Sequence, residues 1–281
     1  MAGLPAEDWS GEAGRRWLSQ VDRFESMLAP IGRALIATAK LEPGEKLADV
    51  GCGGGATTLE IAAAVAPHGY VTGIDISPDL VSLAVRRRET SGIPNCSFHC
   101  ADAQTTSAYG TPLDRVLSRF GVMFFADSQA AFANMRSWLK PGGEMVFACW
   151  GLPQDNPWFV LTGSVFARFI DLPERDPAGP GPFRFADPEA TAALLRGAGF
   201  SEVSVAPHRS DMALGGAGAS PAEAADFVME AMSLAQPLGE LGGDARQAAR
   251  AALIEALLPH ARASGVILPG SCWFVRARNP G

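Results

Sequence analysis

From Lys46 onward, short apolar runs alternate with amphipathic helical stretches in this chain of 281 residues. The apolar runs that indicate strands are 46–50, 71–75, 96–100, 113–118, 144–150, 200–206 and 271–278. This alternation predicts βαβ units and a parallel sheet, because each strand returns to the sheet through a crossover helix. The pattern therefore indicates an α/β fold, in which ligands bind at the carboxyl ends of the strands.

The regular alternation occupies only part of the chain. Residues 151–186 are rich in proline and glycine, yet they contain an apolar stretch that predicts a helix. A second irregular region, 209–265, holds Ser220-Pro-Ala-Glu223, a capping box that predicts the start of another helix. We expect residues 1–40 to form an N-terminal helical cap. We expect 41–281 to form the main domain, with both irregular regions as lid insertions.

The composition of the chain restricts its possible partners and its expected cellular compartment. Hydrophobic residues make up 47% of the chain, so it can bury a large core, and the net charge of -7 weighs against nucleic acid as a substrate. No apolar run reaches the roughly 18 residues that span a membrane, and the N-terminus lacks a signal-peptide pattern. Five cysteines without a C-x-x-C pair favour free thiols in a reducing cytoplasm. The sequence leaves a homo-oligomer open.

Two other clusters have plain structural interpretations. The basic run 86–88 lies in a predicted helix, where a solvated helix face is favoured over a phosphate-binding patch. Cys96, His99 and Cys100 lie close together, but a tetrahedral zinc ion needs a fourth ligand, and no residue with familiar spacing supplies one. We therefore expect packed core residues there and no metal.

A glycine-rich turn between the first strand and the next helix is the most informative segment. It reads Asp49-Val-Gly51-Cys-Gly53-Gly-Gly55-Ala56. Glycines let the backbone approach a ligand where a Cβ would clash. The helix that follows offers unpaired N–H groups and the positive end of its dipole, which can hold a carboxylate or a pyrophosphate. Gly51, Gly53 and Gly55 are therefore candidate ligand-binding residues.

Loop spacing alone leaves more than one cofactor class open. The loop also satisfies the G-x-G-x-x-G/A fingerprint of dinucleotide-binding folds. Asp75 ends the second strand, 24 positions after Gly51, and its carboxylate can accept hydrogen bonds from the ribose hydroxyls of either kind of cofactor. An NAD(P)-dependent oxidoreductase and a nucleotide-binding protein without catalytic activity are therefore two possible functions of the chain.

Four further features favour a third class of protein over these two. Asp49 lies two positions before the first glycine, Asp102 ends the third strand, Pro-Gly-Gly at 141–143 precedes the fifth, and about 45 residues precede the first. With Val-Thr-Gly-Ile-Asp-Ile-Ser at 71–77, they make roughly 40% of the chain resemble the class I S-adenosylmethionine-dependent methyltransferases. The resemblance is greatest to bacterial relatives of the ubiquinone and menaquinone C-methyltransferases.

The resemblance implies a Rossmann-like, seven-stranded, mostly parallel sheet with an antiparallel last strand, and S-adenosylmethionine as the cofactor. It also implies the residues that line the cofactor, which are Asp49, Gly51, Gly53, Gly55, Asp75, Ile76, Asp102, Ala103 and Ser118. Among them, Asp49 would orient the methionine end and Asp102 would contact the adenine amino group, while Ser118 would contribute mainly its backbone. The likeness fades beyond residue 150 and implies no substrate.

The end of the fourth strand narrows the substrate class. Ser118-Arg-Phe-Gly121 lacks the Asn/Asp-Pro-Pro-aromatic motif of amino-methylating nucleic-acid enzymes, and it lacks the metal-binding carboxylate of catechol-type enzymes. Arg119 is a candidate to hold an anionic or carbonyl oxygen of a substrate, and an ordinary surface salt bridge is the equally favoured alternative. His208 is a candidate base, although a packed or surface histidine is the favoured interpretation. We assign no catalytic residue.

Large apolar residues gather in the regions expected to cover the pocket. They are Trp9, Trp17, Phe24, Met27, Trp150, Trp158, Phe159, Phe227, Met229 and Met232. Each by itself is more often a core residue, but together they favour a small hydrophobic or aromatic substrate. Trp17 and Trp150 join Arg119 as candidate substrate-binding residues.

Overall fold

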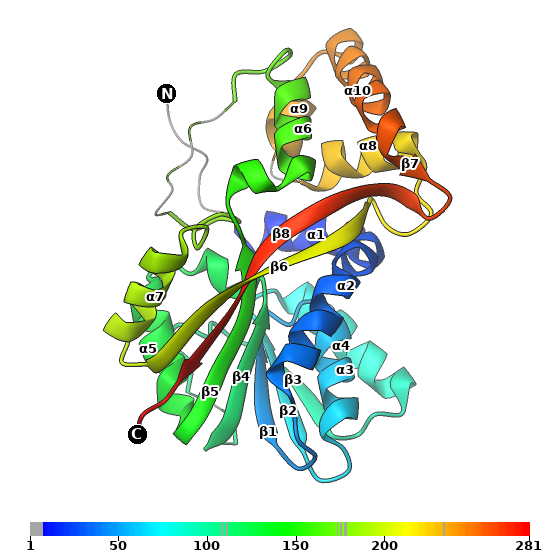
Figure 1. Cartoon of the computed structure of the whole chain (residues 1–281). Helices are drawn as coiled ribbons and strands as arrows, with labels where there is room; N and C mark the ends of the chain where they lie inside the picture. The colour runs from blue at the N-terminus through cyan, green and yellow to red at the C-terminus, as the bar shows by residue number, and fades with distance from the viewer. Residues whose placement is uncertain are drawn as a thin grey trace.

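The computed structural model describes residues 8–107, 109–110, 112–172, 174, 176, 179–232 and 234–281. Within them, the strands form one central sheet with helices on both faces (Figure 1). The strands are β1 (Lys46–Val50), β2 (Tyr70–Asp75), β3 (Cys96–Cys100), β4 (Leu113–Arg119), β5 (Leu139–Trp150), β6 (Ser201–Leu214), β7 (Ala261–Arg262) and β8 (Gly265–Arg278).

The sheet has the predicted mostly parallel arrangement. Its order is β3-β2-β1-β4-β5-β8-β6, and the five strands from β3 to β5 run parallel. β8 pairs antiparallel with β5 on one side and with β6 on the other. The expected Rossmann-like fold with an antiparallel last strand is therefore confirmed. The two-residue strand β7, which pairs with β8, was not expected.

Helices connect and cover the strands. They are α1 (Glu12–Ser19), α2 (Val21–Ala39), α3 (Ala56–Val65), α4 (Pro78–Ser91), α5 (Ser128–Trp138), α6 (Pro157–Phe166), α7 (Pro188–Gly197), α8 (Pro221–Ala231), α9 (Ala235–Gly239) and α10 (Gly243–Leu257). Short 3-10 helices are η1 (Gly121–Phe124), η2 (Pro153–Asp155) and η3 (Leu258–His260). None of the helices in the described residues is long and apolar enough to cross a membrane.

Side-chain caps mark the starts of several helices, among them α8, which begins at the predicted capping box. The hydroxyl of Ser77 accepts a hydrogen bond from the backbone N–H of Leu80, and Asp187 caps α7 in the same way. Ser220 and Glu223 form the complete capping box of α8. Each cap satisfies N–H groups that the first turn of a helix leaves without a partner, so each helix begins where its cap residue lies.

The strands at the C-terminal side of the sheet are longer than expected. β6 and β8 pair continuously from Ser204 with Arg276 to Leu214 with Val266, so 209–214 belong to the sheet and not to the second lid insertion. β5 also begins earlier, and the Pro-Gly-Gly segment 141–143 lies within it at an irregularity in its pairing with β4. Polar residues in the middle of β6 conceal its length in the sequence.

Helix α2, in the segment expected to form the N-terminal cap, packs directly on the sheet. α2 packs against β5, β6 and α3, and its inward face is buried at Phe24, Met27, Leu28, Ile31 and Leu35. These residues follow the helical period of 3 to 4, which places them on one face. α2 therefore contributes to the main core, and residues around 21–39 are an integral part of the sheet's cover (Figure 1).

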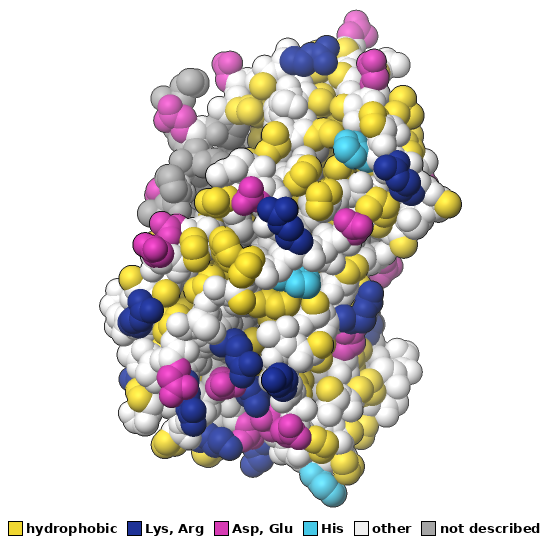
Figure 2. Space-filling view, viewed as in Figure 1, with side chains coloured by type: hydrophobic (Ala, Val, Ile, Leu, Met, Phe, Trp, Pro, Cys, Tyr) yellow, Lys and Arg dark blue, Asp and Glu magenta, His cyan; other side chains and the backbone are white. Residues whose placement is uncertain are grey.

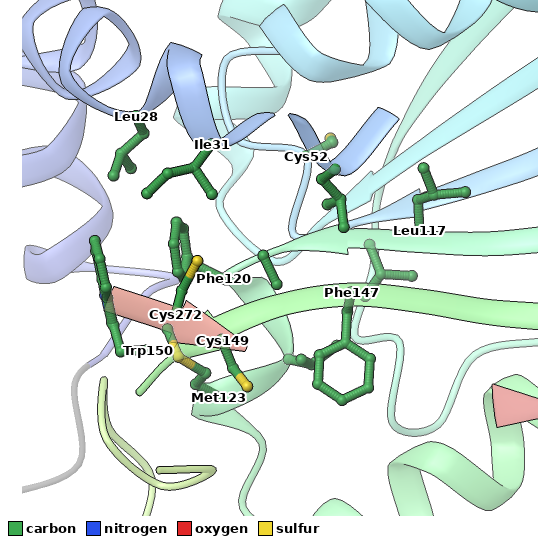
Figure 3. Packing of buried hydrophobic residues seen from close by; sticks show 14 of the residues in the cluster. Leu28, Ile31, Cys52, Leu117, Phe120, Met123, Phe147, Cys149, Trp150 and Cys272 are labelled. Carbon is green, nitrogen blue, oxygen red and sulfur yellow. The ribbon is translucent and has the colours of Figure 1, made fainter. Parts of the chain in front are cut away.

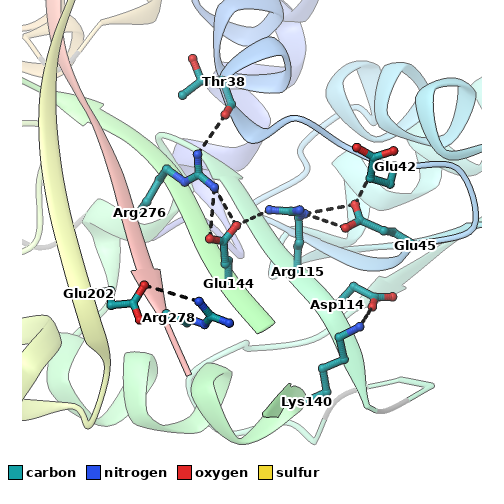
Figure 4. Close-up of polar contacts among 10 residues, drawn as sticks. All are labelled: Thr38, Glu42, Glu45, Asp114, Arg115, Lys140, Glu144, Glu202, Arg276 and Arg278. Atoms are coloured by element: carbon teal, nitrogen blue, oxygen red, sulfur yellow. Dashed lines mark hydrogen bonds and ion pairs between the residues drawn. The ribbon is translucent and has the colours of Figure 1, made fainter. Parts of the chain in front are cut away.

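An ionic network joins the strands at the end of the sheet where β1 begins. Arg115 donates through Nε to the carboxylate of Glu45 at 3.0 and 3.1 Å and pairs with Glu144 (Figure 4). Arg276 donates to the same Glu144 at 2.8 Å and to the carbonyl oxygen of Thr38 at 3.4 Å. The network links α2, β4, β5 and β8. The ligand site lies at the opposite end of the sheet, where the parallel strands have their carboxyl ends.

The surface seen in Figure 2 is mixed in character. On this face, Lys and Arg side chains lie among Asp and Glu side chains, with hydrophobic side chains between them. Basic side chains therefore form no continuous stripe on this face of the described residues. The expectation that the chain does not act on nucleic acid stays a prediction.

Candidate active site

A cavity of about 450 Å³ opens at the carboxyl ends of β1, β2 and β4. The order of the strands changes direction between β1 and β4, and open α/β sheets bind ligands at such a switch point. The glycine loop after β1 forms one side of the cavity, and residues of α1, α2, α6 and η1 complete the wall. This cavity is therefore the place where the predicted cofactor and substrate residues should meet.

The three loop glycines make room for different neighbours. A Cβ on Gly51 would lie 2.6 Å from the Cα of Gly121, so this glycine allows two loops to touch. A Cβ on Gly55 would lie 2.8 Å from the ring of Phe98. At Gly53, which has a φ of +53°, nothing lies within 4 Å of an added Cβ. Gly51 and Gly53 line the cavity and Gly55 does not, so the clashes at Gly51 and Gly55 would be with protein and not with a ligand.

Asp75 ends β2 with its carboxylate held by the backbone. Its Oδ2 accepts a hydrogen bond from the N–H of Gly53 at 2.8 Å, and its Oδ1 accepts one from Ser77 at 2.9 Å. Burial raises the pKa of Asp75, and the hydrogen bonds from the backbone act in the opposite direction. Each oxygen can still accept a further hydrogen bond. Ile76, which is 42% exposed, lines the cavity beside it.

The loop after β3 brings Asp102 and Ala103 to the cavity. Asp102 accepts a hydrogen bond through Oδ1 from the backbone N–H of Gln104 at 2.8 Å, which stabilises the turn. Asn134 of α5 donates through Nδ2 to the carbonyl oxygens of Ala103 and Thr106, at 2.9 and 2.8 Å. The loop is therefore fixed from within and from α5, with half-buried Asp102 at the edge of the cavity.

Asp49 and Ser118 lie beneath the cavity and do not line it. Asp49 is 1% exposed, and its Oδ2 accepts a hydrogen bond from the hydroxyl of Thr58 at 2.6 Å. Burial raises the pKa of Asp49 to about 6, although this hydrogen bond and the charge of Arg119 oppose the shift. The buried hydroxyl of Ser118 has no hydrogen-bond partner in the described residues. Direct contact of either side chain with a cofactor stays a prediction.

An ionic clamp that the sequence did not indicate holds the loop from outside. Arg87 of α4 donates through Nη1 to both carboxylate oxygens of Glu25, at 2.7 and 2.8 Å, and to the carbonyl oxygen of Gly54 at 2.9 Å. Its Nη2 donates to Asp22 at 2.8 Å. Arg87 thus joins α2 and α4 to the glycine loop, and its interpretation as a solvated helix residue is wrong. Glu25 lies 62 positions from Arg87, beyond the reach of any local pattern.

Arg119, the last residue of β4, also lines the cavity. Its side chain reaches α2, since a Cβ built on Gly32 would lie 3.4 Å from Nη1 of Arg119, and the same Cβ would lie 4.0 Å from Oγ1 of Thr57 in the first turn of α3. None of the residues that the structure describes forms a hydrogen bond or an ion pair with this guanidinium. Burial lowers the pKa of Arg119. The cavity therefore contains a cation that has no hydrogen-bonded or ion-paired partner within the described part of the chain.

Aromatic rings form the wall beyond the loop. Trp17 stacks on Phe24, with ring centroids 3.7 Å apart and planes 6° apart, and Trp150 stacks on Phe120 at 4.3 Å. Trp158 of α6 lies 5.1 Å from Trp150. Figure 3 shows Phe120 and Trp150 side by side, near Leu28 and Ile31 of α2. Trp17 and Trp150 both line the cavity, and the apolar part of its wall is called the chamber below.

The other large apolar residues divide between chamber and core. Those that line the cavity are Trp9, Trp17, Phe24, Met27, Trp150, Trp158 and Met232. Phe227 and Met229 are buried in the core away from it, and Phe159 packs on Trp158 outside it. The expectation that these residues gather around one pocket therefore applies to most of them.

The remaining candidates lie outside the cavity. His208 is on β6 and stacks on Phe274, with ring centroids 4.3 Å apart, so it is a packed residue. Cys96, His99 and Cys100 lie along β3, where His99 contacts the hydroxyl of Ser97 at 3.2 Å. In the part of the chain that the structure describes, no group of three or more His, Cys, Asp or Glu side chains could hold a metal ion.

Comparison with known proteins bears on the class of cofactor. Residues 47–143, from β1 through the segment 141–143, match the family model of a methyltransferase domain. Over this segment the chain is similar to methyltransferases. The match supports S-adenosylmethionine as the cofactor, as the resemblance implied. The finer resemblance to the quinone C-methyltransferases stays a prediction.

Curated relatives match part of this chain. The chain is 33% identical over 118 residues to an aklanonic acid methyltransferase of Streptomyces sp. strain C5, covering 42% of this chain and 54% of that one. It is 29% identical over 181 residues to phosphoethanolamine N-methyltransferase 1 of Arabidopsis thaliana, covering 64% of this chain and 33% of that one. The chain therefore spans about half of the length of the first relative and about a third of the length of the second.

Solved structures share the fold of the methyltransferase domain and its surroundings. One is phosphoethanolamine N-methyltransferase 2 of Haemonchus contortus, in complex with phosphomonomethylethanolamine and S-adenosylhomocysteine. It has a TM-score of 0.59 and 15% sequence identity, and the match covers 98% of this chain and 61% of that one. At this identity the similarity shows the fold alone.

Proposed function

We propose that this chain transfers a methyl group from S-adenosylmethionine to a small hydrophobic or aromatic molecule. The observation that carries the proposal is that one cavity contains both the glycine loop with Asp75 and Asp102, and an aromatic chamber walled by Trp17 and Trp150. A cofactor in the first part would lie directly beside a substrate in the second. This continuity is what a transfer between two bound molecules requires.

The residues present fit the cofactor. Gly53 opens onto free space, and the carboxylate of Asp75 beside it keeps capacity to accept hydrogen bonds from ribose hydroxyls. Ile76, Asp102 and Ala103 lie at the ends of β2 and β3, where they would hold the adenine. When bound, the cofactor supplies a methyl group on a sulfonium, which is already a strong electrophile.

The chain's own contribution is to position the substrate and to exclude water. Stacked pairs such as Trp17 with Phe24, and Trp150 with Phe120, form rigid walls that would fix the plane of an apolar ring. Alignment of two reactants can lower a barrier by about 7–11 kcal/mol. The structure identifies no histidine among the described residues of the cavity, so we assign no base.

The character of the chamber favours an apolar substrate. The names of relatives point to substrates as different as aklanonic acid and phosphoethanolamine. A phosphate and an amine would need charged partners, because burying an unpaired charge is costly. Aromatic and methionine side chains such as Trp158, Met123 and Met232 wall the chamber. Of the charged residues beside them, Arg16 is paired with Glu12 and Glu25 with Arg87. The aromatic and methionine side chains support a hydrophobic molecule in place of a small zwitterion.

Turnover tests the proposal. The chain is incubated with S-adenosylmethionine labelled in its methyl group and a library that includes aromatic acids, phenols, polyketide-like rings and phosphoethanolamine. We expect label in apolar acceptors. For an accepted substrate, Trp150→Leu should raise KM by about 10-fold, since a stacked aromatic contact is worth on the order of 1 kcal/mol beyond buried area.

The matched control is Trp273→Leu, because Trp273 is paired with Cys149 in the same sheet region but does not line the cavity. It should leave KM unchanged. Equal effects of the two variants would remove the chamber from the site, and transfer to phosphoethanolamine alone would contradict the substrate class. Calorimetric binding of NAD without binding of S-adenosylhomocysteine would overturn the whole proposal.

A further inference from the structure

Arg119 is a half-buried cation, and two of the three acidic residues that act on its charge already have partners. The nearest acidic groups that act on its charge include Asp49 and Glu25. Asp49 accepts a hydrogen bond from Thr58, and both oxygens of Glu25 accept from Arg87. A cation removed from water without a hydrogen-bonded partner is costly, so such a group is retained where a ligand supplies the partner.

The position of Arg119 indicates which part of the cofactor it would contact. Asp75 and Asp102 lie at the ends of β2 and β3, on one side of the glycine loop, and Arg119 lies at the end of β4, on the other side. If the ribose and adenine occupy the β2 and β3 side, the amino-acid end of the cofactor must extend across the loop toward β4. The carboxylate at that end is an anion in reach of Arg119.

The start of α3 adds to the positive potential at the same place. The guanidinium lies near Thr57, the second residue of this helix of 10 residues. Gly55 precedes the helix and provides no side-chain cap. No capping side chain therefore competes with a ligand for the first backbone N–H groups of α3. Helix starts favour anions, and guanidinium groups bind carboxylates through paired hydrogen bonds.

We propose that Arg119 binds the α-carboxylate of the methionine part of S-adenosylmethionine. This replaces the contact with a substrate oxygen that the sequence indicated for Arg119. The inference rests on the proposed function, since it concerns how the same cavity holds its cofactor. It makes Arg119 the residue that distinguishes the cofactor from adenosine compounds without the amino-acid end, and it leaves the chamber's aromatic walls to bind the substrate.

Isothermal titration with two probes tests the inference without requiring turnover. S-adenosylhomocysteine carries the carboxylate, and 5′-methylthioadenosine lacks the amino-acid end. Arg119→Gln should weaken binding of S-adenosylhomocysteine by roughly 10- to 100-fold, the range expected for a lost hydrogen bond to a charged group. Binding of 5′-methylthioadenosine should change by less than about twofold. Arg119→Lys keeps the charge but not the planar guanidinium that can form two hydrogen bonds with a carboxylate, and should give an intermediate loss of affinity for S-adenosylhomocysteine.

Arg33→Gln is the matched control because it removes a cation from the exposed face of α2, close to Gly32. It should change neither affinity. If Arg119→Gln weakens both probes equally, or if Arg119→Lys binds both as the unaltered chain does, the inference is overturned while the proposed function stands. If the unaltered chain fails to bind S-adenosylhomocysteine, the proposed function falls and the inference falls with it.

Discussion

The ionic clamp on the glycine loop leads to a sharp prediction about stability. Replacing Arg87 with glutamine removes the cation that joins α2, α4 and the carbonyl oxygen of Gly54. The neighbouring Arg86, in the same run of three arginines, is exposed. We expect Arg87→Gln to destabilise the fold and weaken cofactor binding, and Arg86→Gln to do neither.

The structure sets the size of the effect. The side chains of Arg87 and Glu25 are 24% and 15% exposed, so their pair lies between a surface pair and a buried one. Surface pairs contribute roughly 0–1 kcal/mol, and breaking a fully buried pair costs about 3–5 kcal/mol. Asp22 is 90% exposed and adds little. We therefore expect Arg87→Gln to lower the free energy of unfolding by about 2–3 kcal/mol.

Urea unfolding of the two variants and of the unaltered chain measures this difference. A change of less than about 0.5 kcal/mol is typical of a surface substitution, and Arg86→Gln should fall within it. A cycle with Glu25→Gln should show coupling of about 1–3 kcal/mol between Glu25 and Arg87, as expected for charges in contact. Equal free energies for Arg86→Gln and Arg87→Gln, or a cycle without coupling, would refute the clamp.

Two further predictions concern the carboxylates of the site. Asp75→Ala should weaken binding of S-adenosylhomocysteine by about 2–3 kcal/mol, because the ribose hydroxyls and the N–H of Gly53 lose their acceptor; an unchanged calorimetric dissociation constant would show that the carboxylate does not face the ribose. The pKa of Asp49 is raised to about 6 by burial, so its ionisation costs stability as pH rises from about 4 through 6. Asp49→Asn should therefore be more stable than the unaltered chain at pH 8, by an amount on the order of 3 kcal/mol that shrinks toward pH 4; a difference independent of pH in urea unfolding would contradict this.

Features set by residues close together in the chain were predictable from the sequence alone. The caps at Ser77, Asp187 and Ser220 depend on N–H groups two or three positions away, so each helix start follows from a short pattern. The apolar run of β2 stops at Asp75, and Asp102 follows the end of β3 by two positions. Because parallel strands bring their carboxyl ends to one edge, Asp75 and Asp102 could be placed beside one cavity.

Features set by contacts between distant segments were decided only by the tertiary structure. The segment 209–214 looks like a polar loop, and it becomes a strand because β8 offers it a continuous hydrogen-bonding partner. α2 looks like a detachable cap until its apolar face meets β5 and β6. Local propensity is weak compared with the gain from burying such faces, so packing overrides it.

The roles of individual side chains at the site divide in the same way. Sequence placed Gly51, Arg87 and Arg119 near a ligand loop or on a helix, and it could not say what each would touch. Gly51 is needed because Gly121 approaches it, and Arg87 is engaged because Glu25 lies within reach across 62 positions of chain. Arg119 has no ion-paired partner among the described residues, and that same Glu25 is already bound to Arg87. The chain's local chemistry determined where the cofactor loop lies, and only the packing of α2 and α4 around it decided which charges are free to meet a ligand.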